Sequence, residues 1–538
     1  MRRPIQVCLT PIRLVLLAAV YMTVVFNIAF FKGLATAFPP DQAAPFHVSV
    51  FIAVWAINAL LLLPFSHRLT LKPAIGVLVL LGAVSSYFAV AYNVHFDATM
   101  VQNALNTNPD EAGDLITVKF ITYVLALGVL PIVGLWFVSL STATGKRPLV
   151  KRMTLAATLI ILIAVQVPLF SARYATFIRE HKPLRYQILP AALIQATVTA
   201  VSPHFTRTVE RAPTAPDAHV LASDNDRELL ILVIGETARA DRFSLNGYAR
   251  ETNPQLAKES VISFKEVEAC GTSTAVSVPC MFSIFDADGY SDSRGRETEN
   301  LIDALLHAGI HVLWRDNNSN SRHVAGKVPY QDFKDPANNP VCDVECRDEG
   351  MLAGLQQYID SQTKGDIVIV LHQMGNHGPA YYKRYPPAFE RFKPVCKTAQ
   401  LAECTRDEIG NAYDNAILYT DDFLAKVIAL LKRYDHQFET AMLYVSDHGE
   451  SLGENGLWLH GMPRALAPRE QTMVPAIFWF GAGFEPADAI AVRSRQNDRI
   501  SHHNLFHTVL GVLEIDTHDY DPQLDLRRPR DGVAELRK

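Results

Sequence analysis

The stretch Leu229–Thr237, with the sequence LLILVIGET, decides the fold of this 538-residue chain. It runs through six apolar residues and turns polar at Gly235, Glu236 and Thr237. A short apolar run that ends at a glycine is typical of a strand buried on both faces of a sheet. Ligands of such sheets gather at the carboxyl ends of the strands, so Glu236 stands where a functional side chain is expected.

Four further apolar runs follow, and helical patterns separate them. The strands are expected at His311–Trp314, Ile367–Leu371, Met442–Val445 and Ala476–Phe480. The helices are expected at Glu299–Ala308, Gly350–Ser361 and Asn415–Lys432. This alternation predicts an α/β domain with a mostly parallel sheet and helices on both of its faces.

Two of these strands also end in polar residues. The run Ile367–Leu371 leads into HQMGNH, and the run Met442–Val445 leads into SDHGE. Two carboxylates and one imidazole, from Glu236, Asp447 and His448, suit a divalent metal such as zinc. The alternative is that each acidic residue caps a helix, as Glu236 would for a helix near Ala238.

The segment Cys270–Cys280 (CGTSTAVSVPC) gathers several hydroxyl groups. A hydroxyl at the start of a helix meets inward-pointing N–H groups and the positive end of the helix dipole, which favour a phosphate. A nearby metal would make a threonine hydroxyl able to attack phosphorus. The alternative is a capping turn rich in serine and threonine.

Two loop histidines, His377 and His460, lie close in sequence to the polar strand ends. They could bind a second metal, hold a phosphate or donate a proton to a leaving group. The alternative is that each is an ordinary loop histidine without a role.

The first third of the chain contains five charge-poor runs that are long enough to cross ~30 Å of hydrocarbon as helices. These runs are Leu14–Phe31, Val48–Ser66, Pro73–Val94, Phe120–Thr144 and Met153–Ala172. The first run is too long for the core of a signal peptide and no small-residue cleavage site follows it. We therefore expect an uncleaved anchor.

Basic residues predict the orientation of these spans. They flank alternate ends of the runs: Arg2, Arg3 and Arg13, then Arg68 and Lys72, then Lys146, Arg147, Lys151 and Arg152. The other loops carry fewer positive charges. The positive-inside rule then places the N-terminus in the cytoplasm and the α/β domain in the periplasm, on the far side of a cell inner membrane.

Six of the seven cysteines form near-neighbour pairs after the spans: Cys270 with Cys280, Cys342 with Cys346, and Cys396 with Cys404. Disulfides persist outside the cytosol, so this pattern agrees with export. The alternatives are unpaired core cysteines or metal ligands. Cys8 remains alone before the first span and is expected to be a free thiol.

Three regions follow from these patterns: a membrane domain over residues 1–172, a linker over 173–227 and a catalytic domain over 228–538. Within the linker, Tyr186–Thr199 is apolar enough for a helix on the membrane surface, and Ala212–Asp226 reads as a flexible bridge. The formal net charge of −5 and the absence of a basic cluster argue against nucleic-acid binding.

Taken together, these motifs resemble the phosphoethanolamine transferases that modify lipid A, a group that includes the mobile colistin-resistance enzymes. The matching segments are Leu232–Leu245, Cys270–Ser283, Trp314–Arg322, Leu371–Pro379 and Ser446–Gly461. The resemblance implies a catalytic domain of the alkaline phosphatase superfamily. It also implies zinc, phosphatidylethanolamine as donor and lipid A as acceptor, and we expect a monomer.

The resemblance also assigns roles to single residues. Glu236, Asp447 and His448 match zinc ligands, and Thr274 matches the zinc-bound nucleophile that becomes modified with phosphoethanolamine. His377 and His460 match histidines near the transferred phosphate, which serve an additional zinc in some members. The residues matching substrate-binding positions are Asn318 and Arg322 near the head group, and Asn103, Thr107 and Glu111 for the donor lipid.

The last three residues are spaced by four, which puts all three on one face of a helix, so their loop could present them to the catalytic domain. Arg322 departs from the lysine expected at its position, which keeps the charge but changes the hydrogen-bond geometry. The Cys342–Cys346 spacing is shorter than the family pattern.

The implied reaction is zinc-dependent transfer of phosphoethanolamine through a covalent adduct on Thr274. It would reduce the negative charge of the cell surface and weaken the binding of polymyxins and other cationic peptides. The alternatives are a membrane-anchored phosphodiesterase or a sulfatase-like hydrolase, a transferase that uses phosphatidylglycerol, and a metal- or lipid-binding sensor without activity. The Cys270–Cys280 segment lacks the arginine of the sulfatase signature C/S-x-P-x-R, which counts against a sulfatase.

Overall fold

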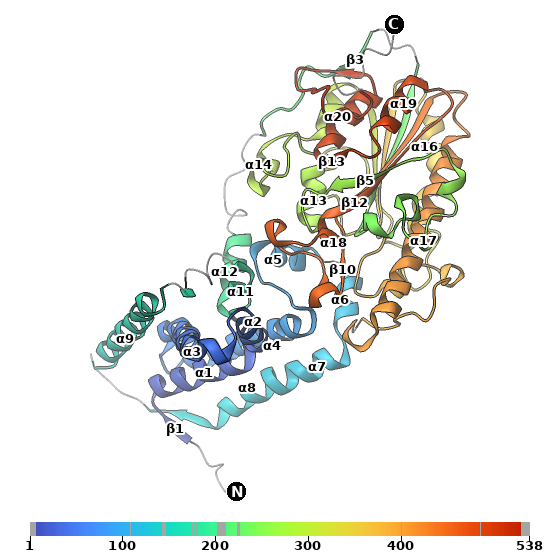
Figure 1. Ribbon diagram of the computed structural model, residues 1–538. Helices are drawn as coiled ribbons and strands as arrows, with labels where there is room; N and C mark the ends of the chain where they lie inside the picture. Colours follow the sequence, from blue (N-terminus) through green and yellow to red (C-terminus); the bar gives the residue numbers. More distant parts are fainter. Residues whose placement is uncertain are drawn as a thin grey trace. The chain divides into compact units, whose positions relative to one another are not determined.

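The computed structural model describes residues 7–107, 109–141, 147–171, 173–174, 177, 181–201, 211–222, 226–399, 401–484 and 486–528. The predicted topology signals at Arg2, Arg3 and Lys146, and the predicted end of the fifth span at Ala172, lie outside the described residues. The chain divides into two compact units, residues 1–105 with 109–205 and residues 106–108 with 206–538. Each unit is described by itself (Figure 1).

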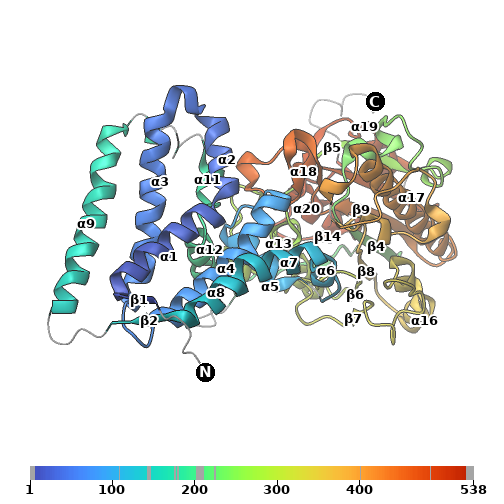
Figure 2. The ribbon, with the colours of Figure 1, turned by 90° about the horizontal axis from the view of Figure 1, so that it is seen from below.

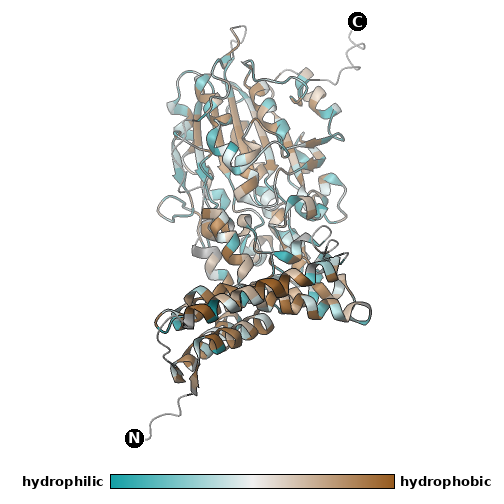
Figure 3. Ribbon diagram, turned by 90° about the vertical axis from the view of Figure 1, so that its left-hand side faces the viewer, coloured by the Kyte–Doolittle hydropathy of each residue, from teal (hydrophilic) through white to brown (hydrophobic). Residues whose placement is uncertain are grey.

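The described part of the first unit contains four helical stretches that are long and apolar enough to cross a membrane. They are α3 (Pro40–Leu62) with the turn that follows it, α4 (Leu71–Tyr92), the stretch Val118–Phe137 and most of α9 (Arg147–Leu169). The bent pair α1 (Pro11–Phe26) and α2 (Ile28–Ala37) makes a fifth if it counts as one span. Apolar residues dominate these helices in Figure 3, and Figure 2 shows them from below.

The first predicted span, Leu14–Phe31, is wrong as a single helix because the chain bends by 63° at Asn27. The buried amide of Asn27 donates to the carbonyl oxygens of Met22 and Leu189, at 3.0 and 2.9 Å. It also accepts a hydrogen bond from the backbone N–H of Leu189 at 2.8 Å. An asparagine side chain can thus replace helical hydrogen bonds inside an apolar run.

The predicted ends of the last two spans also need correction. The fourth helical stretch consists of α7 (Val118–Val124), a π-helical turn, α8 (Leu130–Gly134) and a 3-10 turn, and it ends at Phe137 rather than at Thr144. Strand β2 (Val138–Leu140) follows and pairs in parallel with β1 (Val7–Leu9). The fifth helix begins at Arg147, so basic residues expected in a loop lie on its first turns.

Contacts within the first unit agree with spans that alternate in direction. The β1–β2 pair joins the start of the first span to the end of the fourth. The guanidinium of Arg152, near the start of α9, donates to the carbonyl of Ser66, after the second span, at 2.5 Å. The amide of Gln187, after the fifth span, donates to Asn93, after the third, at 2.8 Å. The start of the first span thus lies beside the end of the fourth, and the end of the second beside the start of the fifth. The end of the third span lies beside the end of the fifth, as spans of alternating direction require.

The expected linker 173–227 divides between the units, with 173–205 in the first and 206–227 in the second. Its helices are α11 (Lys182–Arg185) and α12 (Ala191–Val201), so the helix predicted from Tyr186 begins five residues later. The predicted flexible bridge is wrong for the described residues 212–222. Strand β3 (His219–Val220) pairs with β14 (Ile515–Asp516) and anchors this segment to the second unit.

The second unit is built on an eight-stranded sheet in the order β13-β5-β12-β9-β4-β8-β6-β7. All adjacent pairs are parallel except those that involve β12. The strand bounds are β4 Glu228–Gly235, β5 Ile262–Glu268, β6 His311–Asp316, β7 Tyr330–Asp332, β8 Ile367–His372, β9 Glu439–Ser446, β12 Met473–Phe480 and β13 Arg499–Ser501. A two-stranded hairpin, β10 (Ser451–Leu452) and β11 (Trp458–Leu459), lies after β9.

Alternate residues of the central strands face two separate hydrophobic cores, as the strand period of two requires. Leu230, Leu232 and Ile234 of β4 pack in the core that includes α13 (Thr274–Met281), α15 (Leu301–His307) and α20 (His503–Val512). Leu229 and its alternating partners pack in the core that includes α16 (Leu355–Ser361) and α17 (Arg406–Leu431). The predicted α/β class with helices on both faces is confirmed. Short helices α14 (Asp292–Glu297), α18 (Arg469–Thr472) and α19 (Pro486–Ser494) complete the unit.

All five predicted strands are present, whereas all three predicted helices have different bounds. The helix expected at Glu299–Ala308 spans Leu301–His307. The helix expected from Gly350 begins at Leu355, because Gly354 adopts a positive φ of 71° just before it. The helix expected from Asn415 begins at Arg406, after a capping box in which Thr405 and Glu408 bind each other's backbone N–H groups.

All three predicted disulfides are present, and Cys8 is a free, exposed cysteine.

Candidate functional site

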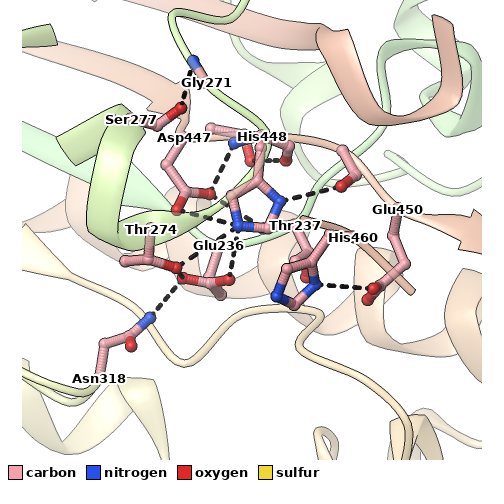
Figure 4. A network of polar contacts seen from close by, with 12 residues as sticks. Glu236, Thr237, Gly271, Thr274, Ser277, Asn318, Asp447, His448, Glu450 and His460 are labelled. Atoms are coloured by element: carbon pink, nitrogen blue, oxygen red, sulfur yellow. Dashed lines mark hydrogen bonds and ion pairs between the residues drawn. The ribbon is translucent and has the colours of Figure 1, made fainter. Parts of the chain in front are cut away.

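The predicted site residues lie at the carboxyl ends of β4 and β9 and at the first residue of α13 (Figure 4). Glu236 follows β4, Asp447 and His448 follow β9, and Thr274 begins α13. All four side chains are buried. The alternative in which Glu236 caps a helix is not found, because no helix begins at Ala238 and the Glu236 side chain turns towards His448.

Each of the three candidate metal ligands has one polar atom fixed by the protein and one left facing the others. Oδ1 of Asp447 accepts from the backbone N–H groups of Thr237 and His448, at 3.2 and 2.7 Å. Oε2 of Glu236 accepts from Thr274 and Asn318, at 3.0 and 2.7 Å. Nδ1 of His448 bonds to the carbonyl of Gly449 at 2.9 Å.

The remaining atoms converge on one point. Nε2 of His448 lies 3.3 Å from Oε1 of Glu236 and 3.4 Å from Oδ2 of Asp447. Apart from this contact with His448, both oxygens are buried without a hydrogen-bond donor, and the ligand atoms of the three residues lie within 4.8 Å of one another. Two carboxylate oxygens and one imidazole nitrogen that face one another in this way fit a tightly bound divalent cation.

The pKa values of these three residues also favour a bound cation. Burial and then the charge of Glu236 raise the pKa of Asp447 to about 6. Burial disfavours the charged form of His448, but Asp447 and Glu236 outweigh it and raise the pKa of His448 to about 10. Burial likewise disfavours ionised Glu236, but the hydrogen bond and charge of His448 hold its pKa below the usual range. The cluster therefore retains a positive charge on His448, which a metal cation would replace.

Thr274 faces this cluster from the N-terminus of α13. Its Oγ1 lies 3.0 Å from Glu236 and 3.4 Å from Nε2 of His448. Ser273 precedes it in an extended conformation, and the helix then begins, so the first N–H groups of α13 lie beside the Thr274 hydroxyl. A hydroxyl group, a candidate metal site and a helix N-terminus therefore lie side by side.

His377 and His460 also lie beside the cluster. The ring centroid of His460 is 4.5 Å from that of His448 and 5.2 Å from that of His377. Nδ1 of His460 bonds to the buried carboxylate of Glu450 at 2.9 Å, whereas Nδ1 of His377 is buried without a hydrogen-bond partner. The structure thus brings both predicted histidines to the site.

Asn318 and Arg322 belong to a chain of side chains that leads to Glu236. The amide of Asn318 is buried and donates to Oε2 of Glu236 and to the carbonyl of Gln373, each at 2.7 Å. The hydroxyl of Ser319 donates to Oδ1 of Asn318 at 2.9 Å and accepts from the guanidinium of Arg322. Asn318 therefore orients a candidate metal ligand.

The predicted donor-binding triplet does not lie on one helix. Asn103 is on α5 (Ala98–Asn106), Glu111 is on α6 (Pro109–Leu115), and Thr107 lies in the break between them. The single-helix prediction is wrong because Pro109 fits the first turn of a helix but interrupts one that would continue through it. The side chains of Asn103 and Glu111 lie outside the described residues.

Three buried carboxylates around the site were missed as functional candidates. Glu450 holds His460. Asp316 accepts from Nδ1 of His372 and from the backbone N–H of Asn318, both at 2.9 Å. Asp348 accepts from the N–H groups of Met374 and Gly375, at 2.8 and 3.1 Å, and so fixes the loop that carries His377. Asp316 and His372 are register partners at the ends of β6 and β8, one or two residues beyond the predicted strand ends.

A glycine permits the close approach of this loop to Glu236. Gly375 has a positive φ of 53°, and a Cβ atom there would lie 2.8 Å from the carbonyl oxygen of Glu236. Only glycine accommodates both the conformation and the contact.

Comparison with known proteins gives consistent matches over nearly the whole chain. A family model described as "Phosphoethanolamine transferase EptA/EptB" matches residues 54–205, and one described as "Sulfatase" matches residues 228–515. Phosphatidylethanolamine transferase Mcr-1 of Escherichia coli is 44% identical over 486 residues, which cover 87% of this chain and 90% of that protein. Phosphoethanolamine transferase EptA of Escherichia coli K12 is 36% identical over 531 residues, which cover 97% of each chain.

A solved structure matches the whole fold. The lipooligosaccharide phosphoethanolamine transferase EptA from Neisseria meningitidis, an integral membrane protein, superposes with a TM-score of 0.92. Its sequence identity is 32%, and the match covers 97% of this chain and 98% of that one. The catalytic unit shares the sulfatase and alkaline phosphatase architecture, and the chain belongs to the EptA/Mcr family of phosphoethanolamine transferases.

Proposed function

We propose that this enzyme transfers phosphoethanolamine from phosphatidylethanolamine to lipid A through a covalent adduct on Thr274, with zinc as cofactor. The observation that carries this proposal is the convergence of Glu236, Asp447 and His448 on a point beside the Thr274 hydroxyl. Membership of the family supports the substrates, since its relatives are named for phosphatidylethanolamine or lipooligosaccharide.

Glu236, Asp447 and His448 would hold the zinc ion, and Thr274 would complete the set. A zinc ion bound there makes the Thr274 hydroxyl more acidic and offsets negative charge on the phosphate. His377 and His460 would serve a second zinc or the transferred phosphate directly.

In the first half-reaction, Oγ1 of Thr274 forms a bond to phosphorus and the bond from phosphorus to the diacylglycerol oxygen breaks. The threonine proton leaves along the hydrogen bond to Oε2 of Glu236, which lies 3.0 Å away. We assign the proton for the leaving diacylglycerol to His460, because Glu450 keeps Nδ1 protonated and leaves Nε2 to exchange a proton. The N–H groups at the start of α13 would bind a phosphate oxygen.

In the second half-reaction, a phosphate oxygen of lipid A attacks the same phosphorus and Thr274 leaves. Oγ1 recovers its proton from Glu236, and the acidic hydroxyl of the lipid A phosphate returns a proton to His460. Each residue thereby regains its starting state. Asn318 would keep Glu236 in position, and Arg322 would bind the head group. Asn103, Thr107 and Glu111 would bind the donor lipid.

The proposed setting is a cell inner membrane, with the N-terminus in the cytoplasm, the catalytic unit in the periplasm and the enzyme acting as a monomer. The alternating contacts of the first unit and the three disulfides of the second support this orientation. The added amine would lower the negative charge of lipid A and weaken its binding of polymyxins.

Mass spectrometry of lipid A from cells with and without the protein tests the transfer. We expect phosphoethanolamine-modified lipid A only with the wild-type protein, and none with Thr274→Ala. A purified enzyme given phosphatidylethanolamine and lipid A should modify lipid A rather than release free phosphoethanolamine. Release into water without modification would identify a phosphodiesterase and contradict the proposal.

A further inference from the structure

His502 is a buried histidine whose two ring nitrogens bind the backbone of two different segments of the site. Nδ1 accepts a hydrogen bond from the N–H of Cys270 at 3.1 Å. Nε2 donates to the carbonyl oxygen of Ser446 at 2.9 Å. Because a backbone N–H only donates and a carbonyl only accepts, the ring is neutral and carries its proton on Nε2.

Ser446 extends this contact to a third segment and to the residues that follow it in its own segment. Its hydroxyl accepts from the N–H of Ala238 at 2.8 Å and donates to the carbonyl of His448 at 3.1 Å. Ala238 lies two residues after Glu236, and Ser446 directly precedes Asp447 and His448. The ring of His502 thus connects, through Ser446, to the segments of all three candidate metal ligands.

The other nitrogen of His502 leads to the nucleophile. Cys270 begins the loop that ends at Thr274, and the N–H of Gly271 bonds to Ser277 of α13 at 2.9 Å. The backbone N–H of His502 also donates to Glu268, at the end of β5, at 3.1 Å. The imidazole therefore joins the loop that carries Thr274 to the strand end that carries Asp447 and His448.

We propose that His502 is a positioning residue that sets the spacing between Thr274 and the carboxylate–histidine cluster. It touches no reacting atom, so it acts through Cys270 and Ser446. The inference rests on the proposed function, because it concerns the zinc ligands and the nucleophile named there. Groups outside a metal site that orient its ligands commonly change metal affinity or activity by about 10–100-fold.

Three substitutions separate the two hydrogen bonds. His502→Phe keeps a ring and removes both bonds. His502→Gln places an amide donor near the position of Nε2 and keeps the bond to Ser446. His502→Asn places an acceptor near the position of Nδ1 and keeps the bond to Cys270. His503→Phe is the matched control, because His503 is the next residue and its ring bonds to the carbonyl of Ile284, outside the site.

The full-length protein in detergent is measured in three ways. Zinc affinity is obtained by competition with a chromophoric chelator, and the rate of adduct formation on Thr274 by intact mass in a single turnover with phosphatidylethanolamine. Hydrogen exchange of the Cys270 amide reports its bond directly, and a melting temperature accompanies each variant.

We expect His502→Phe to lose about 10–100-fold in both zinc affinity and adduct rate, with the KM for phosphatidylethanolamine nearly unchanged. His502→Gln should regain zinc affinity but not adduct rate, and its Cys270 amide should exchange fast. His502→Asn should regain adduct rate at saturating zinc but not zinc affinity. His503→Phe should match the wild type in all three.

The inference is wrong if His502→Phe matches His503→Phe in zinc affinity and adduct rate. It is also wrong if the Gln and Asn variants lose both quantities equally and in step with their melting temperatures, which would indicate general destabilisation. If His502→Phe does not fold, the Gln and Asn variants decide by the same criterion. A wild-type enzyme that binds no zinc and forms no adduct would instead contradict the proposed function.

Discussion

Oε1 of Glu450 lies 2.9 Å from Nδ1 of His460, and the other oxygen of the same carboxylate accepts from the N–H of Gly378 at 3.1 Å. Glu450 is fully buried, whereas His460 is partly exposed. One carboxylate therefore fixes His460 and the loop that carries His377. A histidine oriented in this way presents a defined nitrogen to a substrate.

Glu450→Gln should lower kcat by about 10–100-fold and leave the KM for phosphatidylethanolamine nearly unchanged. The amide cannot accept the Nδ1–H hydrogen bond of His460 as strongly as the carboxylate does, so the loss should appear in the proton-dependent step and alter the pH profile of kcat. Steady-state kinetics with defined lipids measure both constants. Glu266→Gln, at an exposed ion pair with Arg469, is the control. An unchanged kcat would remove the assigned role of the pair.

Thr274→Ala should abolish transfer, with a loss of at least about 10³-fold, because no other atom of the residue can bond to phosphorus. Thr274→Ser should keep a reduced activity. Intact mass after incubation with phosphatidylethanolamine should show the adduct for the wild type and not for Thr274→Ala. Thr298→Ala is an equal truncation outside the cluster and should behave as the wild type. Transfer by folded Thr274→Ala would exclude Thr274 as the nucleophile.

Removal of the metal should stop transfer and lower the melting temperature, and zinc should restore both. Without a cation, one buried oxygen of Glu236 and one of Asp447 face only the ring of His448, which is unfavourable for two carboxylates. Magnesium should restore little, because it prefers six oxygen ligands. The measurements are activity and thermal unfolding after chelation and dialysis. An enzyme that resists a strong chelator, with no metal found by elemental analysis, would contradict the cofactor.

The buried pair of His372 and Asp316 should make stability depend on pH. Burial lowers the pKa of His372, but Asp316 outweighs it and raises the pKa above the usual 6.5. Burial favours protonated Asp316, but His372 outweighs it and lowers the pKa below 3.8. The His372 contribution is present below pH 6.5 and is lost as pH rises through the raised pKa. The Asp316 contribution is present above pH 3.8 and is lost as pH falls through the lowered pKa.

His372→Gln should therefore destabilise the zinc-loaded enzyme by about 3 kcal/mol between these two values, since it leaves Asp316 buried without its cation. The difference from the wild type should shrink as pH rises further. Melting temperatures from pH 4 to pH 9 measure this, with His311→Gln, at the exposed start of β6, as the control. A difference that is constant with pH would show that the pair is not ionised.

The strands that were predicted correctly share one property, which is a continuous apolar run. Strand β5, Ile262–Glu268, was missed because the consecutive charged residues Lys265 and Glu266 interrupt its apolar run, and only part of the strand is buried. Strands β7 and β13 have three residues each, too few for a pattern. The bend at Asn27 was also missed, since hydropathy does not register one amide that replaces helical hydrogen bonds.

The site residues that could be predicted are metal-binding residue types that closely follow a predicted strand, as Glu236, Asp447 and His448 do. The residues that support the site could not be found in this way, because Asp316 and His502 act on groups that are distant in sequence. Pro109 in the sequence argues against a helix that continues through Thr107. The prediction used only the spacing of the three residues and did not take this proline into account.

Thr274 lies between Cys270 and Cys280, which are joined by a disulfide, and this affects how the enzyme should be produced. The six paired cysteines lie outside the strands of the eight-stranded sheet, so that sheet can assemble before any thiol is oxidised. Chain made in a reducing compartment would then keep a native-like scaffold while its reactive loop lacks a covalent tether. Recombinant material from such a host would look well folded by circular dichroism and still be a poor catalyst, so oxidation state belongs among the first quality checks on any preparation.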